Sequence, residues 1–354
     1  QKEQMENNNL NNSEHSNVNE FNELTKLYDL FNEELRNNWD NISQEEKSAK
    51  LQQMWRNRAI SDAYEPGSTF KLITASAALE EGITDTDKAG EFNCSGSIEV
   101  AGVRIKCWRY YRPHGAQSLR DALMNSCNPV FIGLGQKLGV DTYYNYLHAF
   151  GFLSKTGIDL PNESIGMVGK DYSSDLYLNY TIGQYDTYTP LQLSQYITTI
   201  ANGGKRIKMH LLKGYYDDDN NFIEKETVVL NELSLDKKYL SRIKKGFEAV
   251  MDYGLGKNYM GRVPKPAAKT GTSESFIDTN NDGVVDSKTL TNTFIGYAPY
   301  NNPKMTITVV SPDIVYIDTY TTSRSYANHN CNIFLSKKIH ILLLLLFEFS
   351  FYSS

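Results

Sequence analysis

The sequence predicts an α+β protein in which helices pack against an antiparallel sheet. Two observations support this fold class. Most segments with helical spacing of apolar residues lie before residue 252, whereas the β-rich segments, separated by turns, lie after residue 267. Helices first and strands last, joined by short loops, favour this arrangement over alternating strand–helix units. With 354 residues, 40% of them hydrophobic, the chain can bury a sizeable core.

The two ends of the chain differ in character from its middle. Residues 1–20 are rich in Asn, Glu and Ser and are predicted to be disordered. Residues 21–57 have apolar residues at helical spacing, with a second short helix starting at Asn41 or Ser43. No secretory signal opens the chain, and the apolar run 341–347 is far shorter than the ~20 residues of a membrane-spanning helix. We interpret residues 324–354 as an atypical tail.

The middle of the chain gives a series of predicted elements. Glu65-Pro66-Gly67 is a turn, and an apolar, alanine-rich helix follows over 68–79. Ala101-Gly102 joins two strands into a β-hairpin, and Ser118 starts a helix with Asp121 at capping-box spacing. Further helices are predicted at 129–138, 141–149, 190–202 and 237–252, with Gly139 and Gly151 as stops, and strands at 97–100, 103–108, 267–276, 291–297 and 305–310.

The first candidate catalytic motif is Ser68-Thr69-Phe70-Lys71, at the start of a predicted helix. A spacing of three places Ser68 and Lys71 on one helical face, one turn apart. A serine hydroxyl needs a base to become a good nucleophile, and a lysine can be that base when burial and a nearby cation lower its pKa. The helix N-terminus also favours an oxyanion. The motif therefore predicts Ser68 as nucleophile and Lys71 as base.

The second motif, Ser126-Cys127-Asn128, lies at the end of the helix from Ser118, just before Pro129. A loop at this place can present a hydroxyl and an amide to a cleft. Ser126 is suited to carry a proton between Lys71 and a leaving amine, and Asn128 to hold the peptide amide of a substrate. By itself the pattern carries little information, because helix ends favour both residue types.

The third motif, Lys269-Thr270-Gly271-Thr272, lies in a strand-like run. A strand can bind a peptide along its edge by backbone pairing, and Gly271 lets another backbone come close. Lys269 would supply a second cation. The hydroxyls of Thr270 and Thr272 suit a substrate carboxylate, and the N–H groups of Thr272 and Ser68 can form an oxyanion hole.

Two of these motifs occur a second time in the chain. Ser241 and Lys244 have the same spacing in a helix that we expect to be exposed, and Lys155-Thr156-Gly157 lies in a loop after a helix stop. We interpret both as structural. What distinguishes the first set is its order and its fitting local context. Such a trio is typical of penicillin-binding proteins and class A β-lactamases.

The chain resembles a class B penicillin-binding protein over about residues 56–312. The residues that carry the resemblance are Tyr64-Glu65-Pro66-Gly67-Ser68-Thr69-Phe70-Lys71, Asn125-Ser126-Cys127-Asn128-Pro129, Thr156-Gly157-Ile158-Asp159-Leu160-Pro161, Ile182-Gly183-Gln184, Thr189-Pro190-Leu191-Gln192 and Ala201-Asn202-Gly203-Gly204. The resemblance implies the sandwich fold of penicillin-binding proteins and serine β-lactamases, an antiparallel sheet flanked by helices with an all-helical subregion. It implies a transpeptidase domain over residues 21–323.

The resemblance also implies a function. A serine D,D-transpeptidase at the outer face of the cytoplasmic membrane would cross-link peptidoglycan: Ser68 attacks the D-Ala–D-Ala bond of a stem peptide, and a neighbouring amine accepts the acyl group. Lys71 is then the base, Ser126 the proton relay and Lys269 the electrostatic partner. The expected partners are stem peptides, β-lactams that trap Ser68, and cell-wall synthesis proteins. No cofactor is required, and a net charge of -6 gives no support to nucleic-acid binding.

Three features depart from the family pattern. We find no membrane anchor with a pedestal domain, no segment like the first strands of the central sheet, and no recognisable closing helix after about Ser323. The sequence therefore leads us to expect a catalytic domain whose first strands are missing.

Two groups of residues contain side chains that suit a metal ion. Cys94, Cys107 and His114 can gather at the base of the hairpin and suit a structural zinc ion, with Asp62 as a fourth ligand. A Cys94–Cys107 disulfide, or free thiols beside a structural His-Gly turn, are the alternatives. Cys127 is explained by its motif, and Cys331 lies in the tail. Residues 278–286 resemble the start of a calcium loop, but Thr289 replaces the bidentate glutamate, so a turn is preferred.

Other functions of the same fold stay open. A class A β-lactamase needs a glutamate that activates water, in a Glu-x-x-Leu-Asn pattern that we do not find, and Glu163 instead belongs to Pro161-Asn162-Glu163. A D,D-carboxypeptidase differs only in using water as the acyl acceptor. A truncated domain that binds penicillin without turnover is the non-enzymatic alternative.

Overall fold

The computed structural model describes residues 39–84, 88–168, 177–257, 265–277, 287–315 and 347–348. The chain forms two compact units, Gln1–Arg56 and Asn57–Ser354. In the first, η1 (Trp39–Asn41) precedes α2 (Gln44–Trp55), and the Ser43 hydroxyl accepts the N–H of Glu46 at 3.1 Å. Of the two predicted start positions, Asn41 and Ser43, it is therefore Ser43 that precedes this helix. The predictions for residues 1–38, 278–286 and most of 324–354 lie outside the described residues.

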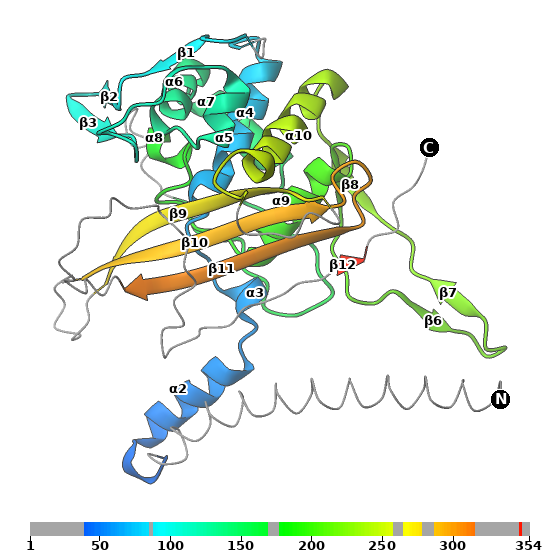
Figure 1. Ribbon diagram of the computed structural model, residues 1–354. Helices are drawn as coiled ribbons and strands as arrows, with labels where there is room; N and C mark the ends of the chain where they lie inside the picture. The colour runs from blue at the N-terminus through cyan, green and yellow to red at the C-terminus, as the bar shows by residue number, and fades with distance from the viewer. Residues whose placement is uncertain are drawn as a thin grey trace, which may run out of the picture. The chain divides into compact units, whose positions relative to one another are not determined.

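The second unit is built on an antiparallel sheet (Figure 1). Its strands are β9 (Ala267–Ile277), β10 (Ser287–Ala298), β11 (Met305–Val315) and β12 (Phe347–Glu348), in the order β12-β11-β10-β9. The three long strands confirm the predicted strands near the end of the chain. Each is longer than predicted, because cross-strand pairing continues beyond the predicted ends: Ser287 pairs with Ile277, and Thr289 pairs with Val315.

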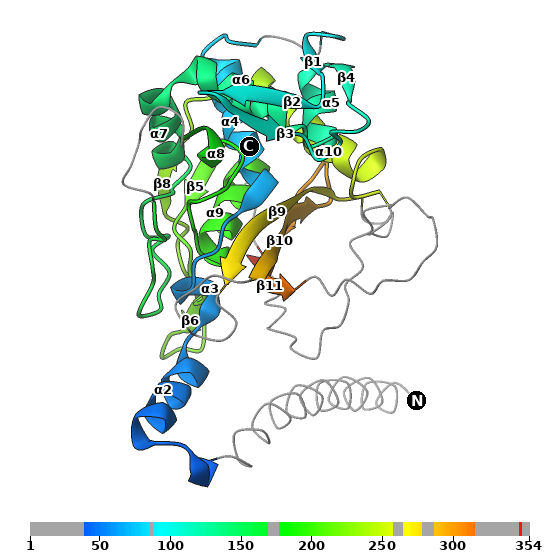
Figure 2. The ribbon, with the colours of Figure 1, turned by 90° about the vertical axis from the view of Figure 1, so that its left-hand side faces the viewer.

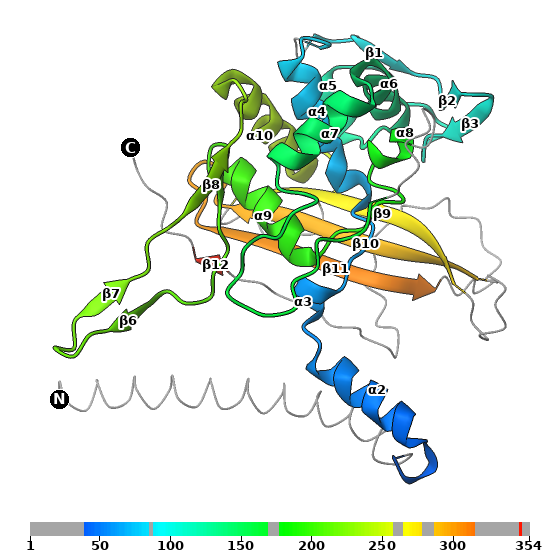
Figure 3. The same ribbon diagram turned by 180° about the vertical axis from the view of Figure 1, so that it is seen from behind.

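Two helices, α9 (Pro190–Ala201) and α10 (Lys237–Asp252), cover one face of this sheet. Tyr297 and Thr306 are cross-strand partners and therefore point to the same face. Phe247 of α10 packs on Tyr297 with ring centroids 6.0 Å apart, and Thr198 of α9 hydrogen-bonds Thr306 at 3.0 Å. Seen from behind, α9 lies in front of the strands (Figure 3). Every residue of α9 is buried, because other elements cover its outer side.

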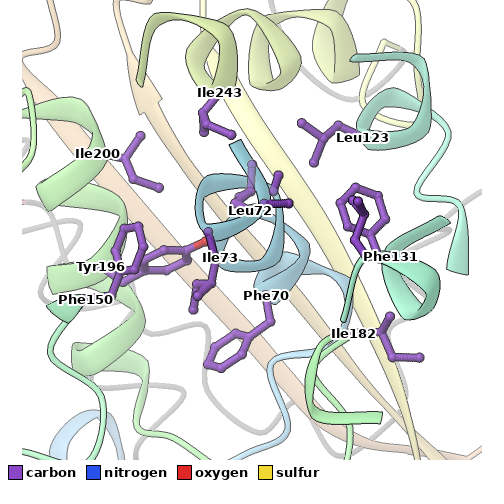
Figure 4. Close-up of a cluster of buried hydrophobic side chains, with 14 of the residues drawn as sticks. Phe70, Leu72, Ile73, Leu123, Phe131, Phe150, Ile182, Tyr196, Ile200 and Ile243 are labelled. Carbon is purple, nitrogen blue, oxygen red and sulfur yellow. The ribbon is translucent and has the colours of Figure 1, made fainter. Parts of the chain in front are cut away.

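The centre of the core is α4 (Lys71–Glu80), of which all residues but the last are buried. Its small side chains allow α6, α7 and α10 to pack closely around it. Its buried polar groups are paired: the Thr74 hydroxyl donates to the Thr181 carbonyl at 2.8 Å. Figure 4 shows Leu72 and Ile73 of this helix among Phe131, Phe150, Tyr196 and Ile243.

The predicted helical subregion lies around α4 and consists of α5 (Leu119–Met124), α6 (Asn128–Leu138), α7 (Val140–Ala149) and α8 (Tyr177–Tyr180). Two short helices lie elsewhere: α3 (Arg58–Ser61) packs on α9, and η2 (Gly67–Phe70) packs on β9. Ser118 and Asp121 form the predicted capping box of α5. Gly139, at φ +76°, ends α6 as predicted. No helix among the described residues is both long enough and apolar enough to cross a membrane.

Four small two-stranded sheets complete the unit. β1 (Phe92–Cys94) pairs with β4 (Gly115–Gln117), and β2 (Ser97–Val100) pairs with β3 (Val103–Lys106), beside α5 and α6 (Figure 2). Ala101 and Gly102 both have positive φ, which confirms the predicted two-residue turn. β5 (Lys205–Ile207) pairs with β8 (Val229–Glu232), and β6 (Gly214–Tyr216) with β7 (Phe222–Glu224). These last strands were not predicted, because they are short and mostly exposed.

Candidate active site

Ser68 lies in the single turn η2, immediately before α4. Gly67 precedes it at φ +57°, and its N–H donates to the Gly183 carbonyl at 2.8 Å. A Cβ on Gly183 would lie 1.9 Å from the Gly67 oxygen, so only glycine fits there. The Thr69 hydroxyl donates to the Pro66 carbonyl at 2.9 Å. The turn that carries Ser68 is therefore fixed from both sides.

Strand β9 packs directly against this turn. A Cβ on Gly271 would lie 2.4 Å from the Pro66 oxygen and 3.2 Å from the Ser68 nitrogen. Gly271 was predicted to let another backbone come close. In the structure this backbone is the turn from Pro66 to Ser68 of the same chain. A Cβ on Gly67 would in turn lie 2.8 Å from the Thr272 nitrogen. The backbone of Thr272 therefore lies close to the turn of Ser68.

Lys71, fully buried at the start of α4, connects the motifs. Its Nζ lies 2.9 Å from Ser68 Oγ, 3.1 Å from Ser126 Oγ, 2.8 Å from the Ser126 carbonyl and 2.6 Å from Asn128 Oδ1. The first motif and the second, 55 residues apart in sequence, thus meet at one amine. Asn128 was predicted to hold a substrate amide, but in this structure its carbonyl oxygen accepts from Lys71.

Ser126 lies between two lysines. The nitrogen of Lys269, on β9, lies 3.1 Å from Ser126 Oγ and donates to the Thr270 carbonyl at 2.8 Å. Ser126 has φ +52°, a conformation that non-glycine residues rarely adopt. This backbone joins the end of α5 to the start of α6 at Asn128. The third motif is therefore also part of the constellation.

Both amines are buried, which disfavours their charged forms. Burial lowers the pKa of Lys71 to about 7, while the nearby thiols Cys127 and Cys107 act in the opposite direction. Burial, and then the charge of Lys71, lower the pKa of Lys269 well below its usual range. The pair therefore favours states with fewer than two positive charges.

The predicted substrate positions on β9 differ in their exposure. Gly271 is buried and Thr270 is partly buried, whereas Thr272 is exposed, and its hydroxyl donates to Asn292 Oδ1 at 3.0 Å. Among the described residues, β9 pairs with β10 alone. Its other edge is therefore not paired with a strand there.

The second copies of the motifs have structural roles. Ser241 is exposed on α10, whereas Lys244 is partly buried and donates to the Ala201 carbonyl at 3.0 Å. Thr156 lies in a loop held by Glu163, whose carboxylate accepts from the Thr156 hydroxyl at 2.5 Å and from its N–H at 2.7 Å. The pattern Ser-x-x-Lys alone therefore did not identify a site, whereas the local context did.

The cysteines form a second cluster beside the motif of Ser126. The ligand atoms of Cys94, Cys107, His114 and Cys127 all lie within 4.8 Å of one another, and the three cysteines are free thiols. The predicted fourth ligand, Asp62, is not among them: its carboxylate accepts from Tyr64 and lies 4.0 Å from Arg58. The sequence analysis explained Cys127 by its place between Ser126 and Asn128. Its position in space makes it a member of this cluster as well.

The thiols of this cluster influence one another. A hydrogen bond with Cys127 and the nearby imidazole of His114 lower the pKa of Cys107 to about 3 against the effect of burial. The same bond with Cys107, together with burial, raises the pKa of Cys127. His114 Nδ1 lies 3.5 Å from Cys107 Sγ, and its buried Nε2 has no hydrogen-bond partner. These contacts favour a thiolate at Cys107 and a protonated thiol at Cys127.

The fold and the three assembled motifs define a transpeptidase domain of the penicillin-binding type, and comparison with known proteins agrees. The family described as "Penicillin binding protein transpeptidase domain" matches residues 5–328. The chain belongs to this family. The resemblance to a class B penicillin-binding protein and the α+β fold class are thus confirmed.

Individual relatives give the extent of the similarity. Penicillin-binding protein 2A of Bacillus subtilis is 41% identical over 292 residues, which are 73% of this chain and 39% of that protein. Stage V sporulation protein D of the same organism is 32% identical over 72% of this chain and 39% of that protein. This chain therefore spans about two fifths of the length of these relatives.

Solved structures show the same fold. Penicillin-binding protein 2B of Streptococcus pneumoniae (strain R6) superposes with a TM-score of 0.64 at 26% identity, over 74% of this chain and 46% of that one. Penicillin-binding protein 3 of Mycobacterium tuberculosis, complexed with ampicillin, superposes with a TM-score of 0.62 at 27% identity, over 73% and 57%.

Proposed function

We propose that the protein is a serine D,D-transpeptidase that cross-links peptidoglycan stem peptides through an acyl-enzyme on Ser68 and is inhibited by β-lactams. Its family membership supports the reaction class. The single observation that carries the roles of individual residues is the set of four contacts around the buried Lys71 amine.

These contacts assign the hydrogens of a neutral Lys71. Asn128 Oδ1 and the Ser126 carbonyl can only accept, so they take the two N–H groups of an uncharged amine. The nitrogen lone pair is then left for a hydroxyl, and Ser68 Oγ at 2.9 Å is the nearest one. Lys71 is thus oriented as a base toward Ser68, which requires the lowered pKa that its burial produces.

The residues of the site can donate and accept every proton that the reaction transfers. Ser68 Oγ attacks the carbonyl carbon of the penultimate D-Ala while Lys71 takes its proton. The tetrahedral oxyanion would be bound by the N–H groups of Ser68 and Thr272. When the C–N bond breaks, Ser126 donates its proton to the leaving D-Ala amine and takes one from Lys71. An acceptor amine reverses these transfers and releases the cross-linked peptide.

The remaining site residues would bind the substrate. A stem peptide can pair with the open edge of β9, which carries Thr270 and Gly271. The exposed hydroxyl of Thr272 and that of Thr270 would hold the terminal carboxylate. Lys269 would act through Ser126, as the second amine on its hydroxyl. We place this domain at residues 21–323, at the outer face of the cytoplasmic membrane, beside other cell-wall synthesis proteins.

One observation weighs against a β-lactamase of the class A kind. The Glu163 carboxylate accepts from Thr156 and Gly157 in its own loop. A carboxylate employed in this way is poorly suited to activate a deacylating water. The choice between amine and water as acyl acceptor, which separates a transpeptidase from a carboxypeptidase, depends on kinetics.

Covalent labelling with a fluorescent penicillin tests the proposal. We expect a stable adduct on the wild-type chain, none on Ser68→Ala, and normal labelling of Ser241→Ala, which alters the second copy of the motif. Release of D-Ala from a pentapeptide, with and without an acceptor amine, then separates the two reactions. A folded wild-type chain without an adduct contradicts the proposal, and rapid loss of the label favours a β-lactamase.

We further propose that Cys94, Cys107, His114 and Cys127 bind a structural zinc ion. Three sulfurs and one imidazole are a donor set that tetrahedral zinc prefers. Their mutual distances require only a small contraction around an ion. A cation would also allow more than one of the packed thiols to lose its proton. Because Cys127 lies between Ser126 and Asn128, a bound metal would fix the loop that carries both.

Metal analysis of the purified chain tests this site. We expect about one zinc ion per chain, its loss in Cys94→Ser and in Cys127→Ser, and full occupancy in Cys331→Ser, which keeps all four ligands. Chelation should lower the melting temperature of the wild type and of Cys331→Ser. It should leave the melting temperatures of Cys94→Ser and Cys127→Ser unchanged. Zinc-free protein with a Cys94–Cys107 disulfide would show that the alternative pairing is the correct one.

A further inference from the structure

A segment next to the active site has a charge that differs from the rest of the chain. Residues 103–112 contain four basic residues and no acidic one, in a chain with a net charge of -6. The four are Arg104, Lys106, Arg109 and Arg112, and all are exposed. Among the described residues, no carboxylate forms an ion pair with them. Glu99 is the cross-strand partner of Arg104, and the other three cations have no such carboxylate opposite them in β2. Such a concentration of positive charge attracts an anionic partner.

The same segment exposes aromatic rings between these cations. Tyr111 is 91% exposed and Trp108 is 43% exposed. Arg109 lies over the Trp108 ring at 5.9 Å, and Lys106 lies over Tyr110 at 4.9 Å. Trp, Tyr and Arg are the residues that most often dominate binding surfaces, and exposed rings of this kind have a cost in water that a partner removes. We call residues 104–112 the basic aromatic loop.

The basic aromatic loop is held in a defined conformation. Cys107 and His114 approach to 3.5 Å and close the residues between them into a loop. The Arg112 N–H donates to the Arg109 carbonyl at 3.0 Å, and the Cys107 N–H donates to the Gly96 carbonyl at 2.8 Å. A preformed surface loses little conformational entropy when it binds.

The loop also borders the catalytic residues. The Trp108 indole N–H donates to the Asn125 carbonyl at 2.9 Å, and Asn125 directly precedes Ser126. Strand β3, whose last three residues begin the basic aromatic loop, and its partner β2 pack on α6, which begins at Asn128 (Figure 2). A polymer that reaches Ser68 as a substrate can therefore contact the basic aromatic loop at the same time.

We propose that the basic aromatic loop binds the carboxylate-bearing glycan strands of peptidoglycan, outside the residues that bind the D-Ala–D-Ala end. The inference rests on the proposed function, because that function brings such strands to the site. Flat aromatic rings pack against the C–H faces of sugar rings, and guanidinium groups bind the carboxylates of stem peptides in a bidentate manner. The loop would thus align a long strand, whereas a small β-lactam would not touch it.

Cosedimentation with purified peptidoglycan sacculi, stripped of attached phosphate polymers, tests the proposal with the full chain. The variant Arg109→Gln/Tyr111→Ala/Arg112→Gln removes two charges and one exposed ring. We expect its apparent Kd for sacculi to rise about 10-fold, equivalent to about 1.4 kcal/mol. Wild-type binding should weaken between 50 and 300 mM NaCl, because salt screens exposed charges.

A matched control variant removes the same number of charges and aromatic rings from a different part of the surface. Lys205→Gln/Lys213→Gln/Tyr215→Ala also removes two exposed charges and one exposed tyrosine, and it should sediment as the wild type does. Fluorescent penicillin should label both variants at the wild-type rate. Equal sedimentation of wild type and loop variant would refute the proposal, and so would an equal loss in the matched variant or loss of labelling in the loop variant.

The remaining outcomes separate this inference from the proposed function. A wild-type chain that takes up penicillin but does not sediment retains the transpeptidase assignment and refutes strand binding. A chain that sediments through the basic aromatic loop without taking up penicillin supports strand binding and contradicts the catalytic proposal. Binding only to sacculi that retain their phosphate polymers would assign the loop to phosphate and overturn the proposal.

Discussion

The pH dependence of acylation follows from the environment of Lys71. The base must be uncharged to accept the Ser68 proton, and burial lowers the pKa of Lys71 to about 7. For a single group with this pKa, the neutral fraction is about 0.1 at pH 6, about 0.5 at pH 7 and about 0.9 at pH 8. The second-order rate constant of acylation should therefore rise about 10-fold between pH 6 and pH 8 and then level off.

A lysine with an ordinary pKa would behave differently. Its neutral fraction would rise about 100-fold over the same two pH units and would continue to rise beyond pH 9. The curve can be measured by quenching reactions with a fluorescent penicillin at fixed times at each pH. Lys244→Met, which alters the second copy of the motif, should give the wild-type curve, and Lys71→Met should give no adduct. A rate that does not change between pH 6 and pH 8, or one that still rises steeply above pH 9, would refute the assignment of Lys71 as a neutral base.

Three further predictions concern the turn of Ser68, the relay and the loop of Glu163. Gly183→Ala should destabilise the protein by about 3 kcal/mol in urea unfolding and abolish penicillin labelling, because a Cβ there meets the backbone of the Ser68 turn. Gly203→Ala, at a similar positive φ but with nothing within 4 Å of the new Cβ, should cost only about 1 kcal/mol and keep labelling; equal costs would contradict the steric argument. Ser126→Ala should slow acylation by about 10²–10⁴-fold without changing the urea midpoint by much, and unchanged acylation would remove Ser126 from the proton path. Glu163→Gln should lower stability by about 1–3 kcal/mol through Thr156, while the lifetime of the acyl-enzyme stays unchanged; faster or slower deacylation would reopen the β-lactamase alternative.

Local patterns in the sequence determined most of the elements of the fold. The capping box at Ser118, the stop at Gly139 and the turn at Ala101-Gly102 involve residues within a few positions of one another, so their physical causes are visible in the sequence. The short strands β5 to β8 were missed, because three or four mostly exposed residues show no periodicity.

The sequence by itself also identified the three motifs. Their order and local context distinguished two of them from their second copies. Only the tertiary structure decided the properties that depend on contacts between distant segments. The lowered pKa of Lys71 comes from burial among elements that the motif does not contain. Cys127 joins Cys94 and Cys107 because two hairpin strands and a helix end meet there, and Gly271 faces the turn of Ser68 because β9 packs against it. Spacing along a chain fixes which residues share an element, whereas distance and dielectric environment arise only when the elements pack.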